Sequence, residues 1–240
     1  MGIKNIIRLF LNSVHLDLTQ NLKYDRLTKL IMKKIINQDS NCIDVGCHKG
    51  EILDDILKLA PKGKHYGFEP IPVMFDNLQR NYKGKAEILP YALSNKDGES
   101  TFQFVKNAPA YSGINKRKYA VEHADIEEIK VELKKLDKLI SKDIKIDFIK
   151  IDVEGGEFDV LRGAVELLKR DRPYVVFEFG LGASEYYGTK PEEIYSFLNK
   201  EIGLKISNLS DFVKGNKSLE LSEFTELYNT NKEYYFIAHK

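Results

Sequence analysis

Apolar and polar positions along the chain change period several times, which predicts alternating strands and helices. Short runs rich in β-branched and aromatic residues have the length of strands, and turn residues or segments of helical period separate them. Strands that alternate with helices in this way are typical of an α/β fold built on a mostly parallel sheet. The predicted strands cover residues 41–45, 64–69, 86–89, 100–105, 129–133, 146–153, 174–179, 204–209 and 233–238. The predicted helices cover residues 49–59, 72–82, 137–140, 157–169 and 191–200.

Two segments differ from this alternation. Residues 146–153 are almost continuously apolar apart from their charged positions, as expected of a central strand that is buried on both faces. Residues 106–125 follow neither period and contain Pro109, Gly113 and His123. We therefore expect a long functional loop in this second segment.

The length of 240 residues suits one core, because single cores stop growing at roughly 250 to 300 residues. We expect an N-terminal helical segment over residues 1–40 and a single domain over residues 41–240. Apolar residues near helical spacing predict an amphipathic N-terminal helix that packs on the domain or on a partner subunit, so a homo-oligomer is one arrangement that the sequence allows. These residues are Ile3, Ile6, Ile7, Leu9 and Phe10.

Composition excludes several classes of protein. With 37 Lys and Arg against 36 Asp and Glu, a net charge of +1 and 42% hydrophobic residues, neither disorder nor charge-driven binding to nucleic acid is expected. No apolar run approaches the roughly 18 residues of a membrane span. Cys42 and Cys47 are too few for a disulfide scaffold and match no zinc pattern. We therefore expect a cytoplasmic protein.

Three acidic residues lie at or just beyond the carboxyl ends of predicted strands: Asp44, Glu69 and Asp152. Ligands of open α/β sheets bind at those ends. Asp44 leads into a turn in which Gly46 allows a close backbone approach and Gly50 allows close helix packing. Glu69 follows Asp44 by 25 residues, which is where an acid binds the hydroxyls of an adenosine ribose. The pattern indicates a cofactor that contains a nucleoside.

Charge favours one nucleoside cofactor over another. A dinucleotide presents a pyrophosphate, which the Asp44 carboxylate would repel, and the turn has two glycines where the dinucleotide fingerprint has three. S-adenosylmethionine has no phosphate and carries an ammonium and a sulfonium, which acidic residues attract. We therefore expect S-adenosylmethionine as the cofactor.

Five segments, taken in order, resemble the FkbM-type family of S-adenosylmethionine-dependent methyltransferases. The resemblance covers roughly residues 40–180, and the fourth segment is its most specific part. The segments are IDVGCHKG, YGFEPIP, ALSNKDGESTF, KIDVEGGEFDVLRGAVELL and VVFEF.

The resemblance implies a Rossmann-like three-layer sandwich whose seven-stranded, mostly parallel sheet has an antiparallel last strand. It implies O-methylation of a small-molecule or glycan acceptor. It also assigns the cofactor site: the methionyl part to Asp44, Gly46 and the neighbouring Cys47, His48 and Gly50, the ribose to Glu69, and the adenine to Pro70, Ile71, Tyr91, Ala92 and Leu93. Asp152 and Glu154 would lie near the transferred methyl group.

Three carboxylates are candidates for catalysis. Asp152 and Glu154 are two residues apart and would project to the same side of an extended strand. Carboxylates so placed repel, which can raise one pKa and prepare a general base, or they can together hold a divalent cation. Glu178, between two phenylalanines, is costly to bury unless it is paired. We take all three as catalytic candidates and leave metal binding open.

Other residues allow two interpretations each. His48 and His123 can each deprotonate a hydroxyl, although a lone histidine is more often structural. The basic run at residues 116–118 fits an anionic acceptor, but we interpret it first as a solvated loop surface. Tyr186 and Tyr187 either stack on a sugar ring or cover the end of the sheet.

Two further functions remain open from the sequence. One is a nicotinamide-dependent oxidoreductase, which the missing third glycine disfavours. The other is a cofactor-binding fold that serves as a non-catalytic subunit, which the presence of Asp44, Glu69, Asp152 and Glu154 disfavours.

Overall fold

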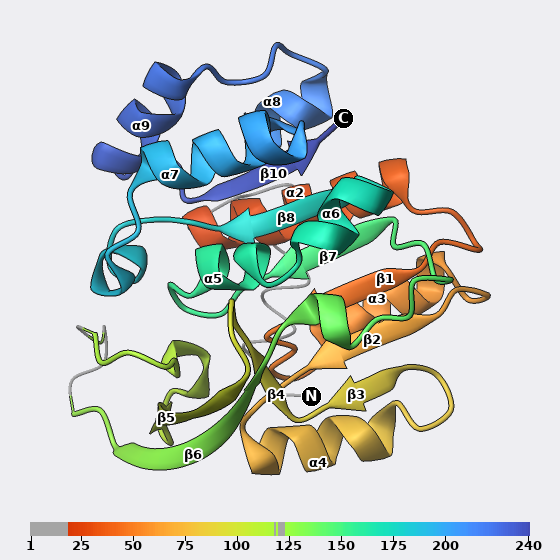
Figure 1. Ribbon diagram of the computed structural model, residues 1–240, viewed down its shortest axis with the longest axis vertical. Coiled ribbons are helices and arrows are strands. Elements are labelled where there is room, and N and C mark those ends of the chain that lie inside the picture. The colour runs from red at the N-terminus through yellow and green to blue at the C-terminus, as the bar shows by residue number, and fades with distance from the viewer. Residues whose placement is uncertain (1–18, 118, 120–122) are drawn as a thin grey trace.

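A seven-stranded sheet forms the centre of the molecule (Figure 1). The computed structural model describes residues 19–117, 119 and 123–240. Neighbouring strands run parallel except for β10, which is antiparallel to both of its neighbours. The order across the sheet is β3 (Glu87–Leu89), β2 (His65–Phe68), β1 (Cys42–Val45), β7 (Phe148–Ile151), β8 (Tyr174–Glu178), β10 (Tyr235–His239) and β9 (Lys205–Asn208). The predicted fold class, with its antiparallel last strand, is confirmed.

Helices cover both faces of this sheet. One core cluster joins Ile43 and Val45 of β1 to helices α5 (Glu157–Arg162), α6 (Val165–Asp171), α7 (Pro191–Ser196) and α9 (Leu221–Asn229). The other joins Cys42 and Phe148 to helices α2 (Gln20–Ile35), α3 (Glu51–Leu59), α4 (Pro72–Asn81) and α8 (Leu209–Lys214). Adjacent strand residues enter opposite clusters because side chains alternate across a strand. The result is a three-layer sandwich.

A second, three-stranded sheet lies beside the main one. Its order is β4 (Tyr91–Leu93), β6 (Ile126–Lys134) and β5 (Gly98–Val105). A small apolar cluster fills it, and Ile71 at the start of α4 packs against Phe102 and Val131 from its strands. The loop between β5 and β6 contains the 3₁₀ turn Pro109–Tyr111. This sheet and its loop stand at the same end of the molecule as the carboxyl ends of β1 and β2 (Figure 1).

Several elements differ from the sequence prediction. The helix expected over 157–169 is two helices, and between them Gly163 lies against the backbone of Ser94, where a Cβ would come within 2.1 Å of the carbonyl oxygen. The helix expected over 191–200 ends in a π-helical turn, Phe197–Ile202. Strand β4 and helices α8 and α9 were not predicted. The apolar N-terminal run from Ile3 to Phe10 lies outside the described residues.

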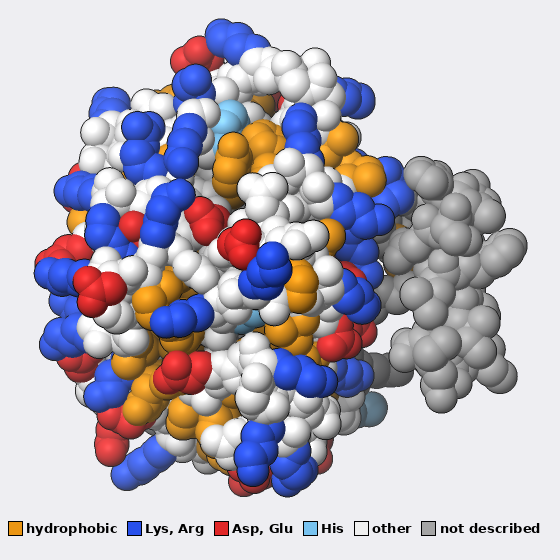
Figure 2. All heavy atoms as spheres, turned by 90° about the vertical axis from the view of Figure 1, so that its right-hand side faces the viewer, with side chains coloured by type: hydrophobic (Ala, Val, Ile, Leu, Met, Phe, Trp, Pro, Cys, Tyr) orange, Lys and Arg blue, Asp and Glu red, His pale blue; other side chains and the backbone are white. Residues whose placement is uncertain are grey.

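Charged side chains are mixed on the face shown in Figure 2. Lysine and arginine side chains alternate there with acidic and polar ones, and they form no continuous basic patch on that face of the described chain. None of the described helices is both long enough and apolar enough to cross a bilayer. The mixture of charges on that face agrees with the net charge of +1.

Replacement of Phe236 by alanine tests the core on which the antiparallel strand depends. This side chain is fully buried, and its ring centroid lies 4.7 Å from that of Phe224. We expect the free energy of unfolding to fall by about 3–5 kcal/mol, measured by urea denaturation. Val73→Ala, at a position that is 56% exposed, should change it by less than about 0.5 kcal/mol. Equal losses in the two variants would contradict this core assignment.

Candidate functional site

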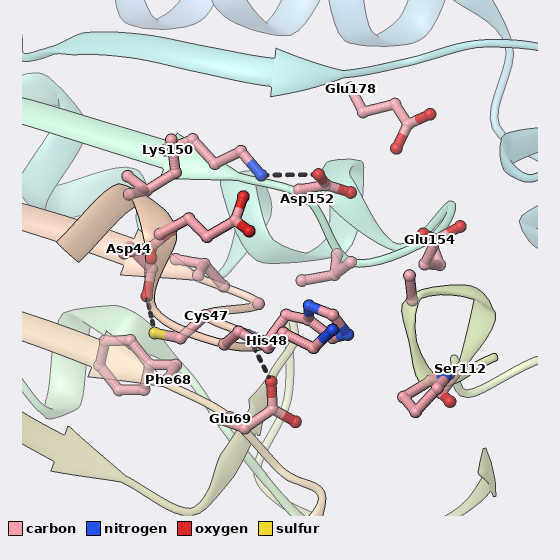
Figure 3. Close-up of a pocket in the computed structure, with 18 of the residues that line it drawn as sticks. Asp44, Cys47, His48, Phe68, Glu69, Ser112, Lys150, Asp152, Glu154 and Glu178 are labelled. Atoms are coloured by element: carbon pink, nitrogen blue, oxygen red, sulfur yellow. Dashed lines mark hydrogen bonds and ion pairs between the residues drawn. The ribbon is translucent and has the colours of Figure 1, made fainter. Parts of the chain in front are cut away.

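A cavity of about 590 Å³ lies at the carboxyl ends of β1, β2, β7 and β8 (Figure 3). Such ends are the usual ligand site of an open α/β sheet. Helix α2 closes one side through Tyr24, Asp25 and Thr28, and the loop between β5 and β6 closes another. The cavity therefore combines distant parts of the chain, and most of the predicted site residues line it.

Asp44, at the end of β1, has the least compensated carboxylate in this cavity. It is 1% exposed, and neither carboxylate oxygen has a hydrogen-bond partner among the described residues. Burial raises its pKa to about 6, and the nearby Lys150 ammonium partly opposes that rise. A buried carboxylate without a donor is costly, so a cationic donor from a ligand would be favoured here.

The turn after Asp44 holds its backbone against β7. Gly46 has φ +82°, and a Cβ there would lie 1.9 Å from the carbonyl oxygen of Asp152. Cys47 is buried and its thiol donates to the Asp44 carbonyl oxygen at 3.2 Å. Gly50, with φ +83°, faces the Tyr82 ring and does not line the cavity. Of the residues that we predicted in this turn, Gly50 therefore acts in packing.

Glu69, at the end of β2, is a second buried carboxylate. One oxygen accepts from the backbone N–H of His48 at 2.9 Å and the other from that of Ile71 at 3.0 Å. Burial nevertheless raises its pKa to about 7. The side chain thus ties the β1 turn to the start of α4 and keeps free lone pairs. The wall next to it consists of Pro70, Ile71, Tyr91, Ala92 and Leu93, as the sequence predicts.

His48 lies between Glu69 and Asp152 (Figure 3). Its backbone is left-handed, with φ +50°, which histidine adopts more readily than most residues. Burial lowers its pKa, so the ring is neutral at neutral pH. By contrast, His123 is exposed and is not among the cavity residues.

A charged cluster occupies the end of β7. Lys150 is 8% exposed, and its ammonium contacts the Asp152 carboxylate at 2.6 Å. The Tyr235 hydroxyl donates to the same oxygen at 2.6 Å. These contacts hold the pKa of Asp152 well below its usual range. Glu178 reaches from β8 toward Asp152, and burial together with that negative charge raises its pKa well above the usual value.

Glu154 completes the acidic cluster, but not through the extended strand that the sequence suggests. Strand β7 ends at Ile151, and Glu154 stands in the following turn with φ +61°. Its carboxylate pairs with Arg117 at 2.8 Å, while burial and Asp152 raise its pKa to about 8. One oxygen each of Asp152, Glu154 and Glu178 lie within 4.8 Å of one another, a spacing that would also suit a cation.

Glu157 holds that turn in place through hydrogen bonds to its backbone. It is 1% exposed, and one carboxylate oxygen accepts from the backbone N–H groups of Val153 at 3.0 Å and Gly155 at 3.1 Å. Gly155 has φ +107° and leaves no room for a Cβ beside the Ala183 carbonyl. Gly155 and Glu157 of the VEGGE segment therefore shape the turn that brings Glu154 to the cavity.

The loop between β5 and β6 forms the outer wall. The Tyr187 hydroxyl accepts from the backbone N–H groups of Ile114 and Asn115, which joins this loop to the segment after β8. In the basic run, Lys116 is exposed and pairs with Glu128, Arg117 points inward, and Lys118 lies outside the described residues. The interpretation of the whole run as a solvated surface is thus wrong for Arg117.

The sequence analysis gave Lys150, Tyr235 and helix α2 no role in the cavity, and it ranked acceptor binding by the basic run that contains Arg117 below a solvated surface. Lys150 could have been identified from the sequence, because a lysine inside an apolar strand needs a buried partner of opposite charge. Arg117 had only the basic run as a signal. Tyr235 and helix α2 had none, since strand register and helix docking bring them to the cavity from the two ends of the chain.

Comparison with known proteins agrees with this arrangement. Residues 44–205 match the family model described as the methyltransferase FkbM domain. Methyltransferase sdnD of Sordaria araneosa is 30% identical over 165 residues, which cover 55% of this chain and 64% of that protein. 2-O-methyltransferase NoeI of Sinorhizobium fredii is 27% identical over 168 residues, which cover 64% of this chain and 68% of that protein.

A solved structure has the same fold. The crystal structure of methyltransferase FkbM from Methylobacillus flagellatus superposes with a TM-score of 0.51 at 12% identity, over 85% of this chain and 44% of that one. This chain thus spans less than half the length of that protein.

Replacement of Gly46 by alanine tests the close approach of the turn to β7. Gly84 has a similar φ of +73° with no atom within 4 Å of an added Cβ, so Gly84→Ala shows the cost of the backbone conformation alone. We expect Gly84→Ala to cost about 1–2 kcal/mol of unfolding free energy and Gly46→Ala about 2–5 kcal/mol, by urea denaturation. Similar costs would show that the Asp152 carbonyl imposes no steric limit.

Proposed function

Because the chain belongs to the FkbM methyltransferase family, we propose that it methylates a hydroxyl oxygen with S-adenosylmethionine as the methyl donor. The observation that carries this proposal is the pair of buried carboxylates at adjacent strand ends, Asp44 and Glu69. The Asp44 carboxylate has no hydrogen-bond donor among the described residues, and Glu69 keeps lone pairs beside an apolar wall.

The cavity fits the chemical groups of this cofactor. The orphaned Asp44 carboxylate would hold the methionyl ammonium, and Glu69 would accept from the ribose hydroxyls. Ile71, Ala92 and Leu93 supply an apolar wall for the adenine. When bound, the cofactor supplies a methyl group on a sulfonium, which the acceptor oxygen takes as the carbon–sulfur bond breaks.

Neither of the other functions fits as well. The pyrophosphate of a nicotinamide cofactor would face the Asp44 carboxylate, and the left-handed position before Lys49 carries His48 in place of glycine. A non-catalytic role leaves the charged cluster around Asp152 without a use. Since burial of charge is costly, we favour catalysis.

Glu154 is our candidate for the general base. Asp152 is held ionised by Lys150 and Tyr235, so it is a weak base that orients its neighbours. Glu154 has a pKa raised to about 8, which matches proton transfer near neutral pH. The proton of the acceptor hydroxyl would pass to Glu154 as the oxygen is methylated. Glu178, whose pKa burial and the Asp152 charge raise well above its usual value, would donate to Asp152.

The acceptor is a hydroxyl of a small molecule or glycan. The name of the 2-O-methyltransferase NoeI, at 27% identity, supports oxygen as the methylated atom. The cavity of about 590 Å³ has room for a ligand of ordinary size. Asp152, Glu154, Glu178 and the β5–β6 loop would surround the acceptor.

Cofactor binding should depend on pH and on Glu69. Because burial raises the pKa of Asp44 to about 6 and that of Glu69 to about 7, both carboxyls are protonated at low pH and must ionise to bind the cofactor. Affinity for S-adenosylhomocysteine, measured by isothermal titration, should therefore rise between about pH 5 and pH 8, with proton release. Glu69→Gln should weaken it about tenfold or more.

The matched control for that measurement is Glu87→Gln, on the exposed outer strand β3. It should leave the affinity within about twofold of the wild-type value. Binding of NAD in place of S-adenosylhomocysteine, or equal affinity in the Glu69 and Glu87 variants, would refute the cofactor assignment.

Catalysis should depend on Glu154 as a base. Since its carboxylate must be deprotonated to accept a proton, the rate of methyl transfer from labelled S-adenosylmethionine should rise with pH through about 8. Glu154→Gln should lower kcat by about 10²- to 10⁴-fold while the affinity for S-adenosylhomocysteine stays unchanged.

Two controls accompany this experiment. Glu128→Gln removes an exposed carboxylate that pairs with Lys116, and it should keep the wild-type rate. Exposure to EDTA should also leave the rate unchanged, because Lys150 and Arg117 already compensate Asp152 and Glu154. Loss of activity with EDTA and its return with a divalent cation would assign the cluster to a metal instead.

A further inference from the structure

Arg117 is the cation of the outer cavity wall. Its side chain is 10% exposed, although both neighbours in the sequence are basic and it belongs to a surface loop. The guanidinium lies 5.2 Å from the centroid of the Tyr111 ring and pairs with Glu154 at 2.8 Å. Burial of a guanidinium costs solvation free energy. Hydrogen bonds and ion pairs to several partners are needed to offset that cost.

That compensation is incomplete. Glu154 reaches the guanidinium with one oxygen at Nη2, while the buried Nε of Arg117 has no hydrogen-bond partner among the described residues. Nε and Nη2 donate along the same edge of the guanidinium, the edge that binds a carboxylate with two parallel hydrogen bonds. Half of this edge is therefore free, and Arg117 lines the cavity.

The charges around Arg117 allow an anion to approach. Arg117 contacts Glu154, and the charged groups close to Glu154 are Asp152, Glu157, Glu178 and Lys150. Lys150 pairs with Asp152, and burial raises the pKa of Glu154 to about 8, that of Glu157 to about 7 and that of Glu178 well above its usual value. The outer cavity is therefore less acidic than the number of its carboxyl groups suggests.

We propose that Arg117 binds a carboxylate of the acceptor, so that the substrate is a hydroxy acid whose hydroxyl lies toward Glu154 while its carboxylate occupies the Nε–Nη2 edge. This inference rests on the proposed methyl transfer. Glu154 itself shows that a carboxylate is accommodated at Nη2. Tyr111 and Tyr187, which line the same wall, would contact the rest of the acceptor.

Binding of such an acceptor would also free Glu154 from Arg117, so that Glu154 can act as the general base. The incoming carboxylate takes the place of Glu154 on Arg117, and Arg117 is the cation that lowers the proton affinity of Glu154 most. Once released from Arg117, the Glu154 carboxylate is free to accept the proton of the acceptor hydroxyl as the oxygen is methylated. A neutral acceptor would leave the ion pair between Arg117 and Glu154 intact.

The first test observes Arg117 directly. In protein labelled with ¹⁵N-arginine and saturated with S-adenosylhomocysteine, the Nε–H resonance of Arg117 is assigned by its loss in Arg117→Lys. Glycolate, the smallest hydroxy acid, should shift this resonance in a saturable titration, and glycolamide, its neutral analogue, should not. Arg162, which stacks on Phe158 in a separate groove, is the internal control.

Three results of this titration would overturn the inference. They are an Arg117 resonance that glycolate does not move, one that glycolamide moves equally, and one that inorganic phosphate moves more strongly than glycolate. The last result would point to a phosphorylated acceptor.

The second test separates this inference from the proposed function. Hydroxy compounds are offered with labelled S-adenosylmethionine as free carboxylates and as matched primary amides. The acids should have a kcat/KM at least about tenfold higher, a preference that Arg117→Gln removes and Lys116→Gln keeps. Methyl transfer to amides as fast as to acids would overturn the inference alone. Failure to bind S-adenosylhomocysteine would overturn the proposed function.

Discussion

The site depends on one buried lysine. Lys150 stands in register with Asp44 across β1 and β7, and its ammonium contacts Asp152 at 2.6 Å. The carboxyl groups of Asp44, Asp152, Glu154 and Glu178 lie close to this lysine, and their mutual repulsion in a dehydrated site would otherwise drive most of them to the protonated form. The lysine holds Asp152 ionised and limits the rise in the pKa of Asp44. The protonation of the acidic cluster therefore depends on which cation each carboxylate contacts, Lys150 for Asp152 and Arg117 for Glu154.

Local sequence patterns were sufficient for the main sheet. Its strands are short apolar runs, and the helices next to β1 and β2 begin and end at glycine or proline, so α3 and α4 fall within two residues of their predicted bounds. The missed elements are those that need tertiary packing to form. Strand β4 has three residues and exists only by pairing with β6, and α8 and α9 are short helices that pack on the sheet from loops.

The residues of the candidate site also fall into those that the sequence predicts and those that depend on tertiary packing. Residues at strand ends, such as Asp44 and Glu69, could be placed from the sequence because topology alone brings them together. The residues that set the protonation of these carboxylates could not be placed from the sequence. Lys150 depends on strand register, Arg117 on how a long loop folds back, and Tyr235 on an antiparallel strand inserted from the C-terminal end. Distances between such groups are a product of the whole fold, which a local pattern does not encode.

The walls of the cavity come from nearly the full length of the described chain. Thr19 and Tyr24 line it from one side and Tyr235 from another, and Glu233 accepts from the Tyr24 hydroxyl to join the two flanks. The family match over residues 44–205 includes neither flank. An exchange of that region between relatives would transfer the chemistry of the strand ends without the walls that enclose it. Specificity in such chimeras should follow the donor of the flanks as much as the donor of the matched domain.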